Sequence, residues 1–271
     1  MSSPADLAEK IRGGANTPSR ICVAGCPVDK LSFEEAVKEL CYRLELRIRT
    51  HVVFVNAAKV VRCRQHPALR QVLERADLLL ADGVPVVWAS RLLGVPLPGR
   101  VNGTDLMEGM LRAAAERGYR VYLLGANQEV VTRTVVEIER RYPGVQVVGF
   151  HHGYFQESEE EILVREINAS GADLLLLGMS TPQKEFWGDR NLPRLGVAVC
   201  QGVGGSFDVL AGVVGRAPIW MQRSGLEWLY RLLQEPGRLW RRYLETNSAF
   251  IWLVLIDLAS AWKARWAKNA S

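Results

Sequence analysis

The sequence predicts an α/β protein whose mostly parallel β-sheet is covered by helices on both faces. Short runs rich in Val, Ile and Leu alternate with helix-length connections through residues 20–215. The seven candidate strands are residues 21–25, 51–56, 78–81, 120–125, 145–150, 173–178 and 197–202. Strands that are apolar along their whole length are typical of parallel sheets buried on both faces, so a Rossmann-like architecture is expected.

The segments between these strands have the periodicity of amphipathic helices. Within residues 127–142, apolar side chains recur at the spacing of one helix face, and residues 32–44 have a comparable pattern. Because strands joined by helices run in the same direction, this alternation favours parallel pairing.

Composition divides the chain into three predicted segments. Residues 1–19 have no apolar core segment and no signal-peptide pattern, so they are expected to be a mobile tail. Residues 20–215 form the α/β domain. Strand patterns stop after Gly215, and residues 216–271 are predicted to be a helical appendage rich in Arg and Trp.

The five cysteines are odd in number and contain no C-x-x-C pair. This pattern favours free thiols in a reducing compartment over disulfides or a zinc site. A cytoplasmic location is therefore expected.

The positive charge of the chain is concentrated in the appendage. Residues 216–271 contain nine Lys and Arg against four Asp and Glu, an excess that equals the net charge of +5 of the whole chain, and six of the eight tryptophans. Residues 249–262 are strongly apolar but are interrupted by Asp257 and are shorter than the roughly 20 residues of a membrane span. A helix lying in the interface of an anionic membrane fits this pattern, and a helix packed on the domain or in a homo-oligomer interface is the alternative.

Three glycines end candidate strands where helices begin: Gly125, Gly178 and Gly202. Glycine allows a phosphate to approach the backbone, and the helix that follows attracts its charge, so these loops predict a nucleotide ligand. Ordinary strand-to-helix turns are the alternative. A P-loop is missing, as is a G-x-G-x-x-G motif after the first strand, which argues against an NTPase or a typical NAD enzyme.

Four polar residues are candidates for contact with the substrate. Asp82 follows a strand directly and is placed to act as a base, although capping a helix is the commoner role for Asp there. Asn56 ends the neighbouring strand and could donate hydrogen bonds to a sugar; the alternative is a turn residue. Gln183 follows Pro182 in a loop that could aim its amide into a cleft; the alternative is a solvated side chain. Thr104 lies in a stretch that has the pattern of a helix cap.

The appendage arginines suggest a phosphate site. Most of four arginines share one helix face if a single helix continues past Pro236: Arg231, Arg238, Arg241 and Arg242. Arginine forks match phosphate oxygens, and a departing diphosphate needs its charge neutralised. Because the chain has no D-x-D motif, fixed cations are expected in place of a metal or other cofactor. A solvated basic face is the alternative.

Several of these stretches together resemble one known family. Residues 51–245 are similar to the WecG/TagA/CpsF glycosyltransferases, which build teichoic-acid linkage units, enterobacterial common antigen and capsular polysaccharides. The matching stretches are ADGVPVVWASRLLG, RVNGTDL, GMSTPQKEFW, GVGGSFDVLAG and RAPIWMQRSGLEWLYRLLQEPGRLWRRY.

The resemblance implies transfer of N-acetylmannosamine or a related hexose from its UDP donor to C4 of GlcNAc on a polyprenyl diphosphate, with inversion. It implies that Asp82 is the general base and that Asn56 and Gln183 position the substrate. Tyr154 and Asp208 would contact the nucleoside. It also implies that three arginines of the appendage close over the diphosphate at the inner face of the cell membrane: Arg231, Arg238 and Arg241.

The chain departs from the family at Phe54, where members often have Thr two residues before the Asn. This difference could alter the choice of donor. The competing hypothesis is a catalytically silent nucleotide-sugar sensor or an assembly scaffold. The joint presence of Asp82, Gln183 and the arginines argues against it. Nucleic acid is not an expected partner, because the body is neutral and apolar residues crowd the basic tail.

Overall fold

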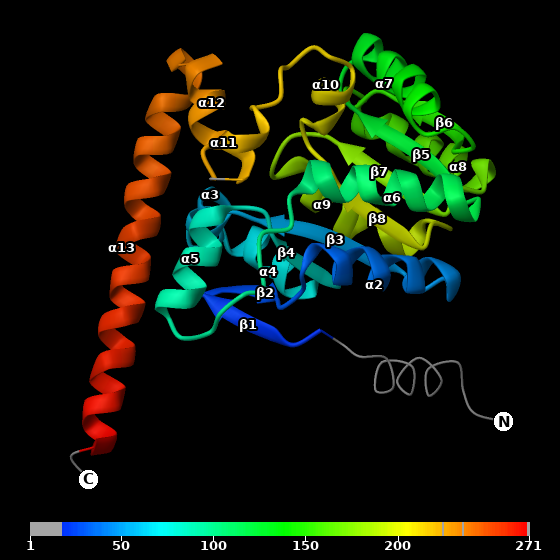
Figure 1. The fold of residues 1–271 in the computed structure, drawn as a ribbon. Helices are drawn as coiled ribbons and strands as arrows, with labels where there is room; N and C mark the ends of the chain where they lie inside the picture. Colours follow the sequence, from blue (N-terminus) through cyan, green and yellow to red (C-terminus); the bar gives the residue numbers. More distant parts are fainter. Residues whose placement is uncertain (1–17, 224, 235, 270–271) are drawn as a thin grey trace, which may run out of the picture.

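The computed structural model describes residues 18–223, 225–234 and 236–269. Their side chains are described too, except those of Arg223, Arg231, Arg238, Leu239, Arg242, Ala261 and residues 263–269. The chain forms a six-stranded parallel sheet between layers of helices, followed by helices that end in a long α13 (Figure 1). The predicted fold class and the helical C-terminal region are confirmed. Most of the predicted N-terminal tail, residues 1–17, lies outside the described residues.

The sheet has the strand order β4-β3-β8-β7-β5-β6, and every neighbouring pair is parallel. Its strands are β3 (Thr50–Val55), β4 (Leu78–Ala81), β5 (Arg120–Gly125), β6 (Gln146–His151), β7 (Leu174–Gly178) and β8 (Val199–Gly202). The two central strands are β8 and β7, and β3 lies between β8 and the edge strand β4. All candidate strands from residue 51 onward belong to this sheet.

The first candidate strand, residues 21–25, is not part of the parallel sheet. It forms β1 (Arg20–Val23), which pairs with β2 (Cys26–Asp29) in a separate antiparallel hairpin. Ala24 and Gly25 form the tight turn with positive φ, which leaves no room for a crossover helix. Asp29 then joins the hairpin to the edge strand β4 by accepting a hydrogen bond from the Leu79 backbone amide at 2.8 Å.

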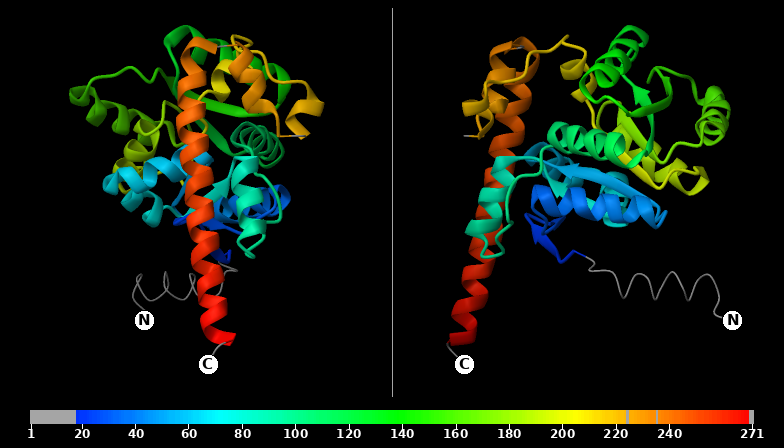
Figure 2. Two further views of the ribbon diagram at one scale, coloured as in Figure 1. Left: turned by 90° about the vertical axis from the view of Figure 1, so that its left-hand side faces the viewer. Right: turned by 45° about the vertical axis from the view of Figure 1, so that its right-hand side comes forward.

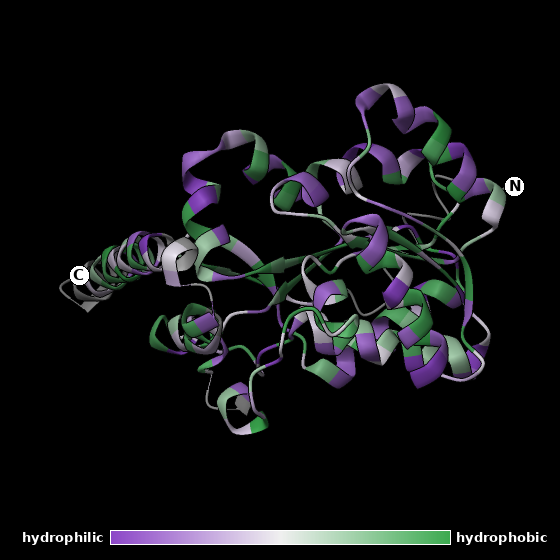
Figure 3. Cartoon of the chain, turned by 90° about the horizontal axis from the view of Figure 1, so that it is seen from above, coloured by the Kyte–Doolittle hydropathy of each residue, from purple (hydrophilic) through white to green (hydrophobic). Residues whose placement is uncertain are grey.

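Helices cover both faces of the sheet, and alternate strand residues pack on opposite faces. Val52 and Phe54 of β3 join one apolar core, whereas Val53 and Val55 join another. The first face is covered by α2 (Phe33–Glu45), α6 (Gly103–Arg117), α7 (Gln128–Arg141) and α10 (Ser206–Leu210). The second is covered by α3 (Ala57–Gln65), α4 (Pro67–Arg75), α5 (Val84–Leu92), α8 (Glu160–Ser170) and α9 (Gln183–Asn191). Viewed from above, the central strands are mostly hydrophobic (Figure 3).

The C-terminal region consists of α11 (Ile219–Arg223), α12 (Glu227–Gln234) and α13 (Pro236–Asn269). Because α13 begins at Pro236, the single helix on which the arginine spacing depended does not form, and Arg231 lies on a different helix from Arg238 and Arg241. The α13 helix runs alongside α3 and extends past the body of the protein (Figure 2).

Both apolar and ionic contacts join α13 to the α/β domain. Phe250 and Val254 are buried in the same core as the α3 side chains, and Arg64 pairs with Asp257 at 3.4 Å. On its outer side α13 exposes large apolar side chains: Ile251, Trp252, Leu255 and Trp262. Within the described part of the chain, no helix is both long enough and apolar enough to span a bilayer.

Candidate active site

A cavity of about 300 Å³ lies beyond the carboxyl ends of β3 and β4, between the α/β domain and the C-terminal helices. One wall consists of residues that follow β3 and β4, including Asn56, Lys59, Arg62 and Asp82. The opposite wall consists of residues of α12 and α13: Glu227, Trp228, Tyr243, Thr246 and Asn247. This is the edge of a parallel sheet at which ligands bind in open α/β folds.

Three helix N-termini meet at this cavity. Asn56 caps α3 by accepting a hydrogen bond from the Lys59 amide at 3.0 Å, and Asn102 caps α6 by accepting from the amides of Thr104 and Asp105. The first residues of α5 also line the cavity. Because each helix N-terminus carries a partial positive charge, their convergence favours an anionic ligand. Asn56 thus has the turn and capping role that its position allowed, and it also lines the cavity.

Asp82 lies directly after β4 and is half-buried in the cavity wall. Its backbone amide donates to the carbonyl of Val55 at 2.9 Å, which aligns it with the end of β3. Its carboxylate accepts a hydrogen bond at 3.3 Å from the amide of Gly103, the first residue of α6. The residue that caps α5 is Gly83, so the carboxylate of Asp82 does not serve as the cap of the helix that follows it.

A buried cluster of Lys59, Lys184 and Glu185 lies at the cavity. The Lys59 ammonium is 2.6 Å from Glu185, and the Lys184 ammonium is 2.8 Å from the same carboxylate oxygen. Burial by itself would raise the pKa of Glu185, but the two ammonium groups lower it to about 2. Burial and the neighbouring Lys59 lower the pKa of Lys184, while the charge of Asp82 acts in the opposite direction. The cluster adds a net positive charge near Asp82, and no sequence pattern predicted it.

Gln183 does not line this cavity. It is the first residue of α9, its side chain is exposed, and its amide oxygen accepts from the Ser180 hydroxyl at 3.4 Å. The neighbouring Thr181 lines the cavity, and the buried Lys184 donates to the Thr181 hydroxyl. Thr181 and Lys184 on either side of Gln183 are therefore turned inward, whereas Gln183 itself is not. A substrate contact of Gln183 stays a prediction.

The three predicted phosphate-loop glycines end β5, β7 and β8, next to one another along the sheet edge. Protein atoms already occupy the space that a side chain would need at two of them. A Cβ on Gly125 would collide with the backbone of Gly178, and a Cβ on Gly178 would collide with Phe207. A Cβ on Gly202 would lie 3.1 Å from Lys184. Close packing therefore accounts for these glycines, and their contact with a nucleotide stays a prediction.

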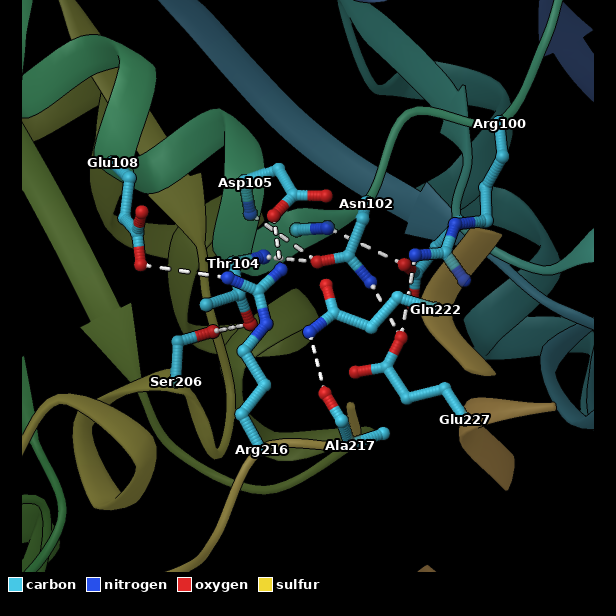
Figure 4. Close-up of polar contacts among 12 residues, drawn as sticks. Arg100, Asn102, Thr104, Asp105, Glu108, Ser206, Arg216, Ala217, Gln222 and Glu227 are labelled. Carbon is cyan, nitrogen blue, oxygen red and sulfur yellow. Dashed lines mark hydrogen bonds and ion pairs between the residues drawn. The ribbon is translucent and has the colours of Figure 1, made fainter. Parts of the chain in front are cut away.

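The other predicted nucleoside contacts lie near the same edge but outside the cavity lining. Tyr154 is in the loop after β6 with its side chain 79% exposed, and Asp208 is in the short helix α10. Thr104 is buried, and its hydroxyl is 2.8 Å from that of Ser206 (Figure 4). This pair joins the N-terminus of α6 to α10, so Thr104 lies behind the cavity wall.

The C-terminal helices are held against the N-terminus of α6 by ionic contacts (Figure 4). Glu227 pairs with Arg100 at 3.2 Å and also accepts from the Asn102 side chain at 3.5 Å. Arg216 pairs with Asp105 and is 3.6 Å from Glu108. Arg100, Asn102 and Glu227 all line the cavity, so the contacts of Glu227 join its two walls.

Trp228 and Tyr243 add an aromatic wall to the cavity. Their ring centroids are 6.0 Å apart in an edge-to-face arrangement, which joins α12 to α13. Among the predicted arginines, the side chains of Arg231 and Arg238 lie outside the described residues. Arg241 is exposed and stacks over Trp240 at 5.5 Å, and it is not part of the cavity lining. Their contact with a diphosphate stays a prediction.

Among the residues that the structure describes, no three His, Cys, Asp or Glu side chains gather as a metal site. Independence from metal stays a prediction, because the donor's own phosphates can supply ligands for a metal ion.

Fold and cavity together define a Rossmann-like α/β protein with a cationic, half-enclosed cavity at the carboxyl edge of its sheet. The chain belongs to the glycosyl transferase WecG/TagA/CpsF family, whose model matches residues 21–264, and it is therefore a glycosyltransferase. It is similar to the N-acetylglucosaminyldiphosphoundecaprenol N-acetyl-beta-D-mannosaminyltransferase of Bacillus spizizenii. The two sequences are 37% identical over 210 residues, which are 78% of this chain and 80% of the relative.

Proposed function

We propose that this protein transfers N-acetylmannosamine or a related hexose from a UDP-sugar to the C4 hydroxyl of GlcNAc on a polyprenyl diphosphate. The reaction inverts the anomeric centre and needs no metal. The observation that carries the proposal is the position of Asp82, a carboxylate in a cavity that cations and three helix N-termini surround. The activity in the name of the Bacillus relative supports the choice of sugar and acceptor.

Asp82 acts as the general base in this mechanism. The hydrogen bond from the Gly103 amide orients the carboxylate, which accepts the proton of the acceptor hydroxyl. The deprotonated oxygen attacks the anomeric carbon as the UDP departs. General-base catalysis of this kind typically contributes about a hundred- to ten-thousand-fold.

The negative charge of the departing diphosphate is balanced by fixed positive charge. The cavity supplies Lys59 and the helix N-termini, and the C-terminal arginines close over the phosphates from outside: Arg231, Arg238 and Arg241. The nucleoside lies along the neighbouring strand ends, near Gly125, Tyr154, Gly178, Gly202 and Asp208. Asn56, Thr104 and Gln183 complete the predicted substrate contacts.

Residues 20–215 form the catalytic domain in this proposal, and residues 216–271 form a membrane-associating appendage. The exposed apolar side chains of α13 and the basic charge of this segment support an anionic membrane as the partner. The protein would then act at the inner face of the cell membrane, where its lipid-linked acceptor lies.

UDP release from the purified protein and its Asp82→Asn variant tests the proposal. The assay contains a short-chain lipid-diphosphate GlcNAc acceptor, a panel of UDP-sugars and EDTA. We expect one donor to give acceptor-dependent UDP, and Asp82→Asn to reduce kcat at least a hundredfold while UDP binding persists. Asp189→Asn, which changes a carboxylate that pairs with Arg75 outside the cavity, is the matched control. If no donor is turned over although UDP binds, the sensor or scaffold hypothesis replaces this one.

A further inference from the structure

Arg62 differs from the other cations that line the cavity. Lys59 is paired with Glu185 and Arg100 is paired with Glu227. Arg62 is half-buried in the cavity wall one helical turn after Lys59, and its guanidinium has no hydrogen bond or ion pair within the described part of the chain. A guanidinium that lines a cavity with its charge unmatched favours an anionic ligand, and its fork matches two phosphate oxygens.

The wall that faces Arg62 across the cavity belongs to α13. Thr246 and Asn247 of this helix line the same cavity, and α13 runs along α3, the helix that carries Arg62. Farther toward the C-terminus, α13 turns Phe250 and Val254 into the core and exposes Ile251, Trp252 and Leu255. A ligand with its polar head between α3 and α13 would therefore meet an apolar surface immediately beyond the cavity.

We propose that Arg62, together with Thr246 and Asn247, binds the diphosphate of the lipid-linked acceptor. This inference rests on the proposed function. The reaction involves two diphosphates, that of UDP and that of the lipid, and the inference assigns a site to the second. The acceptor's C4 hydroxyl must reach Asp82, and its diphosphate is attached at C1, across the sugar ring from C4. Arg62 shares the cavity with Asp82 and faces α13, along whose exposed apolar side chains a prenyl chain can leave.

The test compares Arg62→Ala and Arg62→Lys with the unchanged protein, using farnesyl-diphosphate-linked GlcNAc as acceptor. We expect Arg62→Ala to raise KM for this acceptor about tenfold or more, because a charge-assisted contact to phosphate is lost. KM for the donor and the Kd for UDP should stay within about twofold of the unchanged protein. Arg62→Lys retains the charge without the fork and should have an intermediate effect.

Two matched controls separate a binding role from a structural one. Arg70→Ala removes an exposed arginine of α4 that pairs with Glu74, and it should alter neither KM. An acceptor with GlcNAc on a simple alkyl chain lacks the diphosphate, so Arg62→Ala should leave its kcat/KM unchanged. A loss of activity toward both acceptors, with a lower melting temperature, would indicate a structural role and overturn the proposal.

The same variants distinguish binding of the acceptor diphosphate from binding of the donor diphosphate. If Arg62→Ala raises the donor KM and leaves the acceptor KM unchanged, Arg62 binds the UDP diphosphate and the proposal is wrong. Calorimetric titration of the farnesyl acceptor without donor gives a readout that needs no turnover. Weaker acceptor binding by Arg62→Ala would support the site even if no sugar transfer is detected, whereas equal binding would overturn it.

Discussion

Glu227, the first residue of α12, forms an ion pair with Arg100 at 3.2 Å, and both side chains are largely buried. The same carboxylate accepts from Asn102, the residue that caps α6. Asp82 in turn accepts from the first amide of α6. The attachment of the C-terminal helices and the position of the proposed base therefore depend on one helix N-terminus.

Replacing Glu227 by Ala should open the cavity. The change removes the ion pair and leaves Arg100 partly buried without its partner, at a cost of about 1–3 kcal/mol to the docking of α12. We expect kcat/KM for the UDP-sugar to fall at least tenfold. Hydrogen exchange should become faster in α12 while the sheet is unaffected. Glu245→Ala, at an exposed position of α13, is the control. If hydrogen exchange in α12 is equally fast in both variants, the ion pair of Glu227 with Arg100 does not hold α12 in place.

Replacing Glu185 by Gln should destabilise the protein strongly. Two buried ammonium groups, those of Lys59 and Lys184, lose the carboxylate that they share, and breaking a buried pair in this way costs about 3–5 kcal/mol. Urea unfolding at pH 7 measures the change. Glu160→Gln is the control, because its partner Arg190 is exposed and can be solvated. A cost for Glu185→Gln no larger than that for Glu160→Gln would rule out the proposed coupling.

The stabilising effect of Glu185 should depend on pH in a defined window. Its pKa is lowered from 4.5 to about 2 in the folded protein, so its contribution is complete above pH 4.5 and is lost as the pH falls toward 2. The shift corresponds to about 3 kcal/mol. The difference in unfolding free energy between the unchanged protein and Glu185→Gln should therefore shrink as the pH is lowered from 5 to 3. A difference that stays constant over this range would mean that Glu185 does not titrate as described.

Charged substitutions on the outer side of α13 should weaken membrane binding. Trp252 and Leu255 are 64% and 51% exposed, and placing Glu at both positions removes apolar area and repels anionic lipid. We expect the double variant to lose most of its sedimentation with phosphatidylglycerol vesicles. Val136→Glu, on an exposed apolar position of α7, should bind as the unchanged protein does. If the double variant still binds, another surface contacts the membrane.

The nature and order of most elements could be predicted from the sequence, because each depends on a local pattern. The candidate strands from residue 51 onward all joined the parallel sheet, and the predicted cap in residues 100–106 formed, although the capping residue is Asn102. The strand at residues 21–25 was assigned to the wrong sheet, since an apolar run does not reveal its partner. The shared face of the arginines required a helix that continues past Pro236, whereas Pro236 begins α13.

The composition of the cavity is less accessible to sequence reasoning. Asn56 and Asp82 follow strands, and the carboxyl ends of neighbouring parallel strands meet, so both could be predicted to lie together. Lys59, Arg62 and Glu185 gave no such signal, because charged residues in amphipathic helices usually face solvent. A spacing of three between Lys59 and Arg62 places them on one helix face but does not say what that face contacts.

The sequence by itself determined the α/β alternation, the position of Asp82 at a strand end and the basic, Trp-rich character of the C-terminal region. These properties depend on residues close together in the chain, whose periodicity and charge can be read directly. Only the tertiary structure decided that Lys184 and not Gln183 is turned inward, and that α12 and α13 form one wall of the cavity. It also decided that Arg62 has no partner among the residues that the structure describes. Such properties depend on how segments more than a hundred residues apart pack together, and burial and ion pairing are fixed by that packing.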